Sequence, residues 1–149
     1  MADSTDVLLK LCEQRWVEVK QAEDQRSALS NIILLIASAI VGIFTQKGLD
    51  RNNLPLSLLL IFLGIYGAIG ARKYRERIYY SLSIIKLYRD KLDKLYPDAQ
   101  IEELRIQAKE FHEKRHPFMT KVYPNQLWVA LHTSIAIAGC ILTVFILSL

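Results

Sequence analysis

Three long runs without a charged residue dominate this sequence. They cover residues 28–46, 54–71 and 127–149, and none of them holds an Asp, Glu, Lys or Arg. A transmembrane helix needs about 20 apolar residues, and about 17 is the practical minimum. The third run alone has 23 residues, which is too long to bury inside a chain of 149 residues. The sequence therefore predicts an all-α membrane protein with three transmembrane helices.

The basic residues are distributed unevenly around these runs. Residues 1–27 hold four Lys and Arg and residues 72–126 hold thirteen, whereas the loop between the first two runs holds only Lys47 and Arg51. Cytoplasmic segments of membrane proteins are enriched in Lys and Arg. We therefore expect residues 1–27 and 72–126 on the cytoplasmic side of the membrane and the C-terminus on the other side.

The first 27 residues carry the pattern of an amphipathic helix. Apolar side chains recur with a period near 3.6 from Val7 to Ala22, and Asp3 and Asp6 lie near the start, where the helix dipole favours an acidic side chain. We expect this N-terminal helix to precede the first transmembrane helix and to pack against the second cytoplasmic segment.

The second cytoplasmic segment, residues 72–126, is predicted to be a helical hairpin. Its first arm has apolar residues at steps of three or four, namely Ile78, Leu82, Ile85, Tyr88, Leu92 and Leu95. Pro97 ends that pattern, and a second apolar pattern runs from Ile101 to Phe111. The first arm, about 25 residues long, would reach about 37 Å at 1.5 Å per residue, so we expect it to continue the second run as one helix.

A stripe of basic and aromatic side chains follows the first arm. Arg72, Arg75, Tyr79 and Lys86 fall within roughly 60° of one another on a helical wheel, away from the apolar face, and Arg89 lies further along the same helix. Arg and Lys neutralise phosphates, and tyrosine rings stack on bases. This basic-aromatic stripe predicts a binding site for a nucleotide or a short single-stranded nucleic acid.

Two simpler explanations of the stripe remain open. Arg72 and Arg75 lie directly at the membrane exit, where basic side chains reach the anionic lipid headgroups. Lys86 and Arg89 would lie some 20 Å further along the helix, well beyond a Debye length of about 8 Å. For these two residues, pairing with Asp90 or Asp93 on the same helix is the alternative.

The transmembrane runs contain polar and small residues as well. Asn31, Ser38, His132 and Thr133 are candidates for lining a pore, because polar residues within a membrane face other helices or a water-filled path. For His132 the alternative is a position at the membrane interface. Three helices enclose no pore, so conduction requires a homo-oligomer, for example four copies around an axis. The small-residue ridge Ala130, Ser134 and Ala138 permits close helix packing, either within one chain or between copies.

The sequence gives little support for an enzyme or for a metal site. Arg105 and His112 are seven residues apart, which resembles the Arg and His pair of HEPN ribonucleases, but such pairs are common in any basic helix. Cys12 and Cys140 suggest neither a disulfide nor, with the histidines, a metal site. We expect a protein that is not an enzyme and has no cofactor and no metal. A membrane-anchored HEPN-like ribonuclease is kept as a second alternative.

In layout the chain resembles the small membrane effectors of bacterial antiphage systems. A short N-terminal helix, a tight two-span hairpin and the basic helix RKYRERIYYSLSIIKLYRDKLDKLYP are similar to the SLATT class and to the transmembrane effector of the Hailong system. SLATT domains have two spans, and the third span at 127–149 departs from them. The resemblance implies an ion channel in the bacterial inner membrane that acts in abortive infection. It also implies gating by a nucleotide or nucleic-acid signal from a partner nucleotidyltransferase, bound at the basic-aromatic stripe. The alternative is a non-conducting adaptor that docks a soluble partner on the hairpin.

Overall fold

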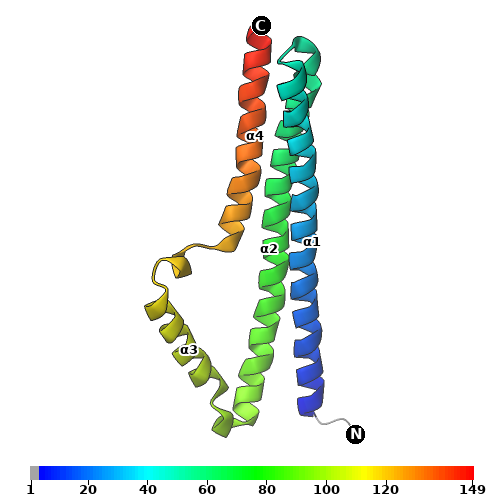
Figure 1. Ribbon diagram of the computed structural model, residues 1–149. Helices are drawn as coiled ribbons and strands as arrows, with labels where there is room; N and C mark the ends of the chain where they lie inside the picture. The colour runs from blue at the N-terminus through cyan, green and yellow to red at the C-terminus, as the bar shows by residue number, and fades with distance from the viewer. Residues whose placement is uncertain (1–3) are drawn as a thin grey trace. The chain divides into compact units, whose positions relative to one another are not determined.

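The protein is built from four α-helices joined by short turns (Figure 1). The computed structural model describes residues 4–149, and no strand occurs among them. The helices are α1 (Ser4–Lys47), α2 (Leu54–Leu95), α3 (Ile101–Arg115) and α4 (Pro124–Ser148). By length and composition α1, α2 and α4 are able to cross a membrane. The predicted all-helical membrane protein with three candidate spans is thereby confirmed.

Helix α1 joins two segments that we expected to be separate. The N-terminal helix and the first apolar run form one helix of 44 residues. No Gly or Pro occurs between Ser4 and Gly42, so nothing in the sequence interrupts the backbone hydrogen bonds near residue 27. The helix is followed by Gly48, whose φ of 79° and N–H bond to the Phe44 carbonyl form a left-handed cap. Asp3, which we placed at the start of this helix, lies outside the described residues.

Helix α2 is continuous for 42 residues, as its pattern predicted. It has Pro55 in its first turn, where a missing N–H costs nothing. Its last turn is followed by a 3₁₀ turn, Pro97–Ala99, and by Gln100 in the left-handed region at a φ of 48°. The Asp93 carboxylate accepts a hydrogen bond from the Ile101 N–H at 2.8 Å. The end of α2 therefore caps the start of α3.

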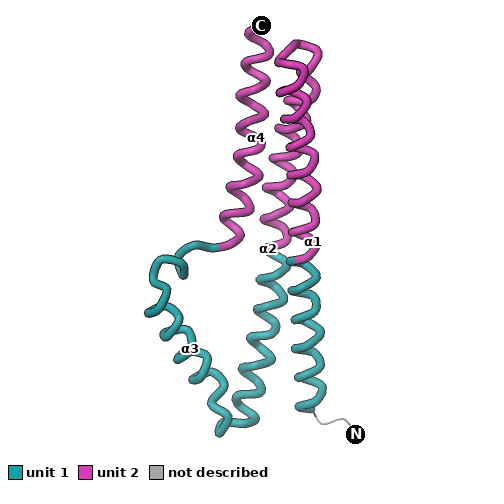
Figure 2. Tube along the Cα trace, viewed as in Figure 1, with its two compact units in different colours: residues 1–23, 76–123 teal, residues 24–75, 124–149 magenta. Residues whose placement is uncertain are grey.

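The chain divides into two compact units (Figure 2). The first unit contains the described residues up to Glu23 together with Glu76–Tyr123. The second contains Asp24–Arg75 and Pro124–Leu149. Helices α1 and α2 contribute to both units, whereas α3 belongs to the first and α4 to the second.

In the first unit, α1 and α2 run antiparallel with an apolar seam between them. The buried seam residues are Leu8, Val19 and Ala22 on α1 and Ile78, Ile85 and Leu92 on α2. The Thr5 and Tyr96 hydroxyls lie 2.8 Å apart, and the Ser81 hydroxyl donates to the Glu18 carboxylate at 3.4 Å. The expected packing of the N-terminal segment against the first arm of the hairpin is therefore present. Helix α3, in contrast, has no buried residue.

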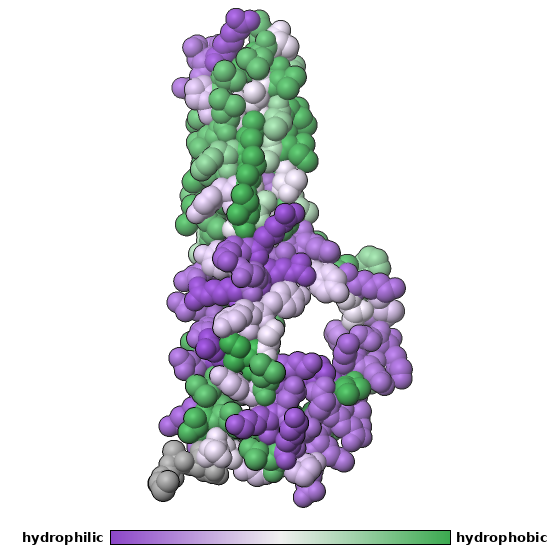
Figure 3. All heavy atoms as spheres, turned by 180° about the vertical axis from the view of Figure 1, so that it is seen from behind, coloured by the Kyte–Doolittle hydropathy of each residue, from purple (hydrophilic) through white to green (hydrophobic). Residues whose placement is uncertain are grey.

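The second unit is a three-helix bundle formed by α1, α2 and α4. Its core cluster consists of Ala37, Ile40, Phe44, Leu60 and Ile146. The Thr143 hydroxyl on α4 donates to the Ser57 hydroxyl on α2 at 2.9 Å. The Arg26 guanidinium lies 5.4 Å from the centre of the Trp128 ring, a cation–π contact between α1 and α4. One face of the molecule shows hydrophobic side chains gathered over this unit (Figure 3).

Candidate functional site

The five residues of the basic-aromatic stripe divide between the two units. Arg72 and Arg75 belong to the second unit, where they line an open cavity of about 580 Å³. Tyr79, Lys86 and Arg89 belong to the first unit and do not line this cavity. All five residues nevertheless belong to the one continuous helix α2, so the stripe as a single ligand site stays a prediction.

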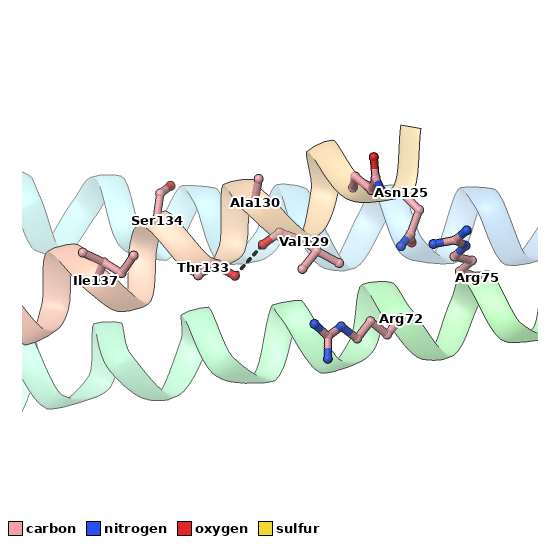
Figure 4. A pocket seen from close by; sticks show the side chains of 9 residues that line it. Arg72, Arg75, Asn125, Val129, Ala130, Thr133, Ser134 and Ile137 are labelled. Carbon is pink, nitrogen blue, oxygen red and sulfur yellow. Dashed lines mark hydrogen bonds between the residues drawn. The ribbon is translucent and has the colours of Figure 1, made fainter. Parts of the chain in front are cut away.

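The cavity lies between the middle of α2, just after its uncharged run, and the first half of α4 (Figure 4). Arg72 and Arg75 line it from α2, and Asn125 lines it from the first turn of α4. Val129 and Ile137 supply apolar lining further along α4. No acidic residue lines it, so one end of the cavity is basic and the other is apolar.

Asn125 is a buried polar residue at the start of α4. Its side chain is 8% exposed, and its Oδ1 accepts no hydrogen bond from any residue in the described range 4–149. A buried amide oxygen without a donor is costly. Asn125 has no distinctive sequence signal, because one Asn after a proline resembles an ordinary helix start.

In the first unit, the charges of Lys86 and Arg89 lower the pKa of an acidic residue of α3. The Glu102 carboxylate forms a two-pronged pair with the Arg105 guanidinium, in which Nε donates to Oε2 at 2.7 Å. That hydrogen bond, followed by the charge of Arg105 and then by the charges of Lys86 and Arg89, holds the pKa of Glu102 below its ordinary value. The charges of Lys86 and Arg89 therefore act on an acid of α3 within the chain.

Two further groups near the α1–α2 seam have shifted pKa values. Burial raises the pKa of the Cys12 thiol, and the nearby Arg89 charge opposes this rise. The hydrogen bond to Glu18, at 2.7 Å, raises the pKa of Arg15. Cys12 is therefore a poor nucleophile at neutral pH, because little of it is thiolate.

Of the four candidate pore residues, two share an exposed face of α1. Asn31 and Ser38 are both exposed and lie on the same helix face as Gly42 and Thr45. The buried residues of α1 in this unit, such as Ile40, point roughly the opposite way. A Cβ added to Gly42 would meet nothing within 4 Å. We call Asn31, Ser38, Gly42 and Thr45 the α1 polar stripe.

The polar groups of this α1 polar stripe differ in how they are satisfied. The Ser38 hydroxyl donates to the Leu34 carbonyl at 2.7 Å and the Thr45 hydroxyl to the Gly42 carbonyl at 2.8 Å. No described residue hydrogen-bonds the Asn31 amide. The stripe thus places an unpaired amide on the outside of an uncharged, apolar segment.

The other two candidate pore residues lie elsewhere. His132 is 0% exposed, and its Nε2 lies 3.0 Å from the Ser30 hydroxyl of α1, with the donor set by the ring tautomer. Its ring packs so closely on Gly67 of α2 that a Cβ there would collide with it. His132 therefore joins all three helices of the bundle. Thr133 is exposed, donates to the Val129 carbonyl at 2.7 Å and lines the cavity.

The small residues of the spans serve different surfaces. Gly64 packs against the backbone of α4 at Ala136, so this small residue permits helix contact within one chain. The ridge Ala130, Ser134 and Ala138 is exposed, and its first two members line the cavity. The sequence indicates that Gly64 and Gly67 permit close helix packing, but it does not indicate which residue each glycine contacts.

No metal-binding cluster is found among residues 4–149. No group of three His, Cys, Asp or Glu side chains lies close enough to hold a metal ion. The Arg105 guanidinium is engaged by Glu102, and the His112 ring lies 5.2 Å from the His116 ring.

Comparisons with known proteins give no family assignment. No protein-family model, curated protein or solved structure shows significant similarity to this chain. The resemblance to SLATT-class and Hailong effectors therefore stays a prediction from layout.

Proposed function

We propose that the protein is a homo-oligomeric membrane channel in which the α1 polar stripe of each copy faces a shared axis. The observation that supports this is the unpaired Asn31 amide on an exposed face of an apolar helix. An amide without a partner in hydrocarbon costs several kcal/mol, roughly 2–7 depending on the reference. Polar residues in membranes accordingly face other helices or water. Three helices of one copy enclose no path, so several copies, for example four, are needed.

Ion flux from vesicles tests this proposal. Purified protein reconstituted into vesicles should release a trapped monovalent ion, and replacing both Asn31 and Ser38 by Leu should reduce release at least tenfold. Cys140→Leu is the matched control, because Cys140 is exposed on α4 and lies off the stripe. Absence of flux from the unmodified protein, under all ligand conditions, would contradict the channel.

The proposed regulator is an anionic ligand on the cytoplasmic side. A nucleotide or short single-stranded nucleic acid would use the basic-aromatic stripe, in which Tyr79 is 48% exposed and tyrosine rings can stack on bases. Affinity for a short single-stranded oligonucleotide should fall by about 0.7 log units per phosphate contact for each log unit of salt. Lys86→Gln should weaken binding, and Lys109→Gln on α3 serves as the control. Binding that does not respond to salt would remove this ligand class.

The cellular role rests on the resemblance in layout alone. It would be that of an antiphage effector in the bacterial inner membrane, activated by a signal from a nucleotidyltransferase and causing abortive infection. Cells that express the protein together with an adjacent nucleotidyltransferase should be protected against phage, and cells that express the protein alone should not. Equal phage titres in the two kinds of cell would count against the role.

A non-conducting adaptor is the second candidate, and one observation favours it. Helix α3 has no buried residue, and it exposes 58% of Leu104 and 65% of Phe111. A soluble partner that covers this face would account for both side chains. An adaptor should show no flux, and Phe111→Ser should weaken partner binding without changing membrane insertion. Flux together with an unaffected interaction would reject it.

A further inference from the structure

The cavity between α2 and α4 has the chemistry of a lipid site. It is basic at the end formed by Arg72 and Arg75, which is where the uncharged run of α2 ends. It is apolar toward Ile137. We propose that this cavity binds an anionic phospholipid, with its phosphate at the two arginines and one acyl chain along α4. This goes beyond the proposed channel function, and it does not depend on conduction.

The dimensions agree with a lipid in one leaflet. From Asn125 to Ile137, α4 rises about 18 Å at 1.5 Å per residue, and one leaflet of a hydrocarbon core about 30 Å thick is about 15 Å deep. The cavity volume of about 580 Å³ falls within the roughly 300–1,000 Å³ of small-molecule sites. A site that begins at the polar boundary and continues to the middle of the membrane suits a chain attached to a headgroup.

The electrostatics favour an anion at the basic end. Arg72 and Arg75 are joined there by the first turn of α4, whose free backbone N–H groups and dipole add positive potential. No acidic side chain lines the cavity. The buried Asn125, which lines the same end, has an amide oxygen that no described residue satisfies. A headgroup with a hydroxyl donor beside its phosphate, as in phosphatidylglycerol, would supply an anion for the two arginines and a hydrogen-bond donor for the Asn125 oxygen.

The apolar lining separates a lipid from a soluble nucleotide. Val129, Ala130 and Ile137 offer an acyl chain favourable burial. The Thr133 and Ser134 hydroxyls beside them already donate to carbonyls of their own helix. A soluble nucleotide would therefore use the part of the stripe that contains Tyr79, Lys86 and Arg89. The two ligands would then bind to different parts of α2.

Native mass spectrometry of the full chain in detergent tests the proposal. Short-chain phosphatidylglycerol should bind at least tenfold more tightly than phosphatidylcholine of the same chain length, and glycerol 3-phosphate should show no detectable binding. Arg72→Gln with Arg75→Gln should weaken phosphatidylglycerol binding at least tenfold. The matched control is Lys73→Gln with Arg77→Gln, which removes the same charge from residues of α2 that do not line the cavity. It should change binding less than twofold.

A second variant tests the apolar part of the cavity. Ala130→Leu fills space beside the acyl chain from an exposed position, so it should weaken phosphatidylglycerol binding while leaving the melting temperature of the protein unchanged. Equal losses in the two charge variants would show that net charge alone attracts the lipid and would overturn the site. Equal binding of glycerol 3-phosphate or a short oligonucleotide, lost with Arg72 and Arg75, would overturn the lipid in favour of a soluble anion.

Discussion

At the scale of single residues, His132 organises the second unit. It is the only buried histidine among the described residues, and it contacts both Ser30 on α1 and Gly67 on α2. A hydrogen bond within a membrane bundle contributes on average about 0.6 kcal/mol. The larger effect is steric, because only a residue without a Cβ leaves room for the imidazole at position 67. The histidine and the glycine therefore form one packing unit.

Gly67→Ala should destabilise the bundle. The added methyl overlaps the His132 ring, and overpacking of this kind costs roughly 1–3 kcal/mol. Unfolding of the detergent-solubilised protein measures the loss. Gly42→Ala, at a position with open space, is the matched control and should cost nothing, since Ala favours a helix more than Gly does.

The same pair allows a stricter test. In a His132→Ala background the clash is absent, so Gly67→Ala should cost clearly less there than in the native protein. Equal costs in the two backgrounds would show that the imidazole is not what excludes a side chain at position 67.

At the scale of elements, the long helices follow directly from the sequence. The uninterrupted pattern from Leu54 to Leu95 contains no proline after Pro55, and the helix runs through it. The prediction divided α1 at residue 27, because the composition changes from charged to apolar there. The helix itself continues through this position. Charged and apolar segments join in one helix when no residue breaks the hydrogen-bond pattern.

The site was less accessible from the sequence than the helices. Helical periodicity relates residues of one helix, so it found the exposed positions Asn31 and Ser38 on a shared face of α1. It carried no information about pairs between helices. The contact of Ser30 with His132, the cavity beside Arg72, and the action of Lys86 on Glu102 all depend on how distant segments meet.

The α1–α2 seam of the first unit predicts a contrast between neighbouring positions. Ile85 is 1% exposed and Leu87 is 66% exposed on the same helix. Ile85→Ala should lower the free energy of unfolding by about 2–5 kcal/mol, as large-to-small changes in cores do. Leu87→Ala should change it by no more than about 0.5 kcal/mol. Similar losses at the two positions would show that the seam does not hold the helices together.

At the scale of the whole molecule, the chain combines three helices able to cross a membrane with segments rich in Lys and Arg. If the positive-inside rule applies, residues 72–126 lie in the cytoplasm and the turn after α1 lies outside. The lipid site would then face the cytoplasmic leaflet, where anionic lipids attract basic side chains.

Labelling of intact cells checks this orientation. In a background with Cys12 and Cys140 replaced by Ser, a membrane-impermeant maleimide should label Asn52→Cys and spare Gln107→Cys until the cells are opened. Both positions are exposed, so access depends on the membrane and not on burial. The reverse pattern would place the basic segments outside and remove the cytoplasmic ligand.

Modification of a cysteine placed in the α1 polar stripe tests whether this stripe lines a path for ions. Currents are recorded from planar bilayers that contain Ser38→Cys in the cysteine-free background, before and after a charged, water-soluble thiol reagent is added. The account predicts that the reagent blocks or strongly reduces the current, and that the same reagent leaves Ile141→Cys, exposed on α4, unaffected. Unchanged current through a Ser38→Cys channel that carries the label would contradict the account.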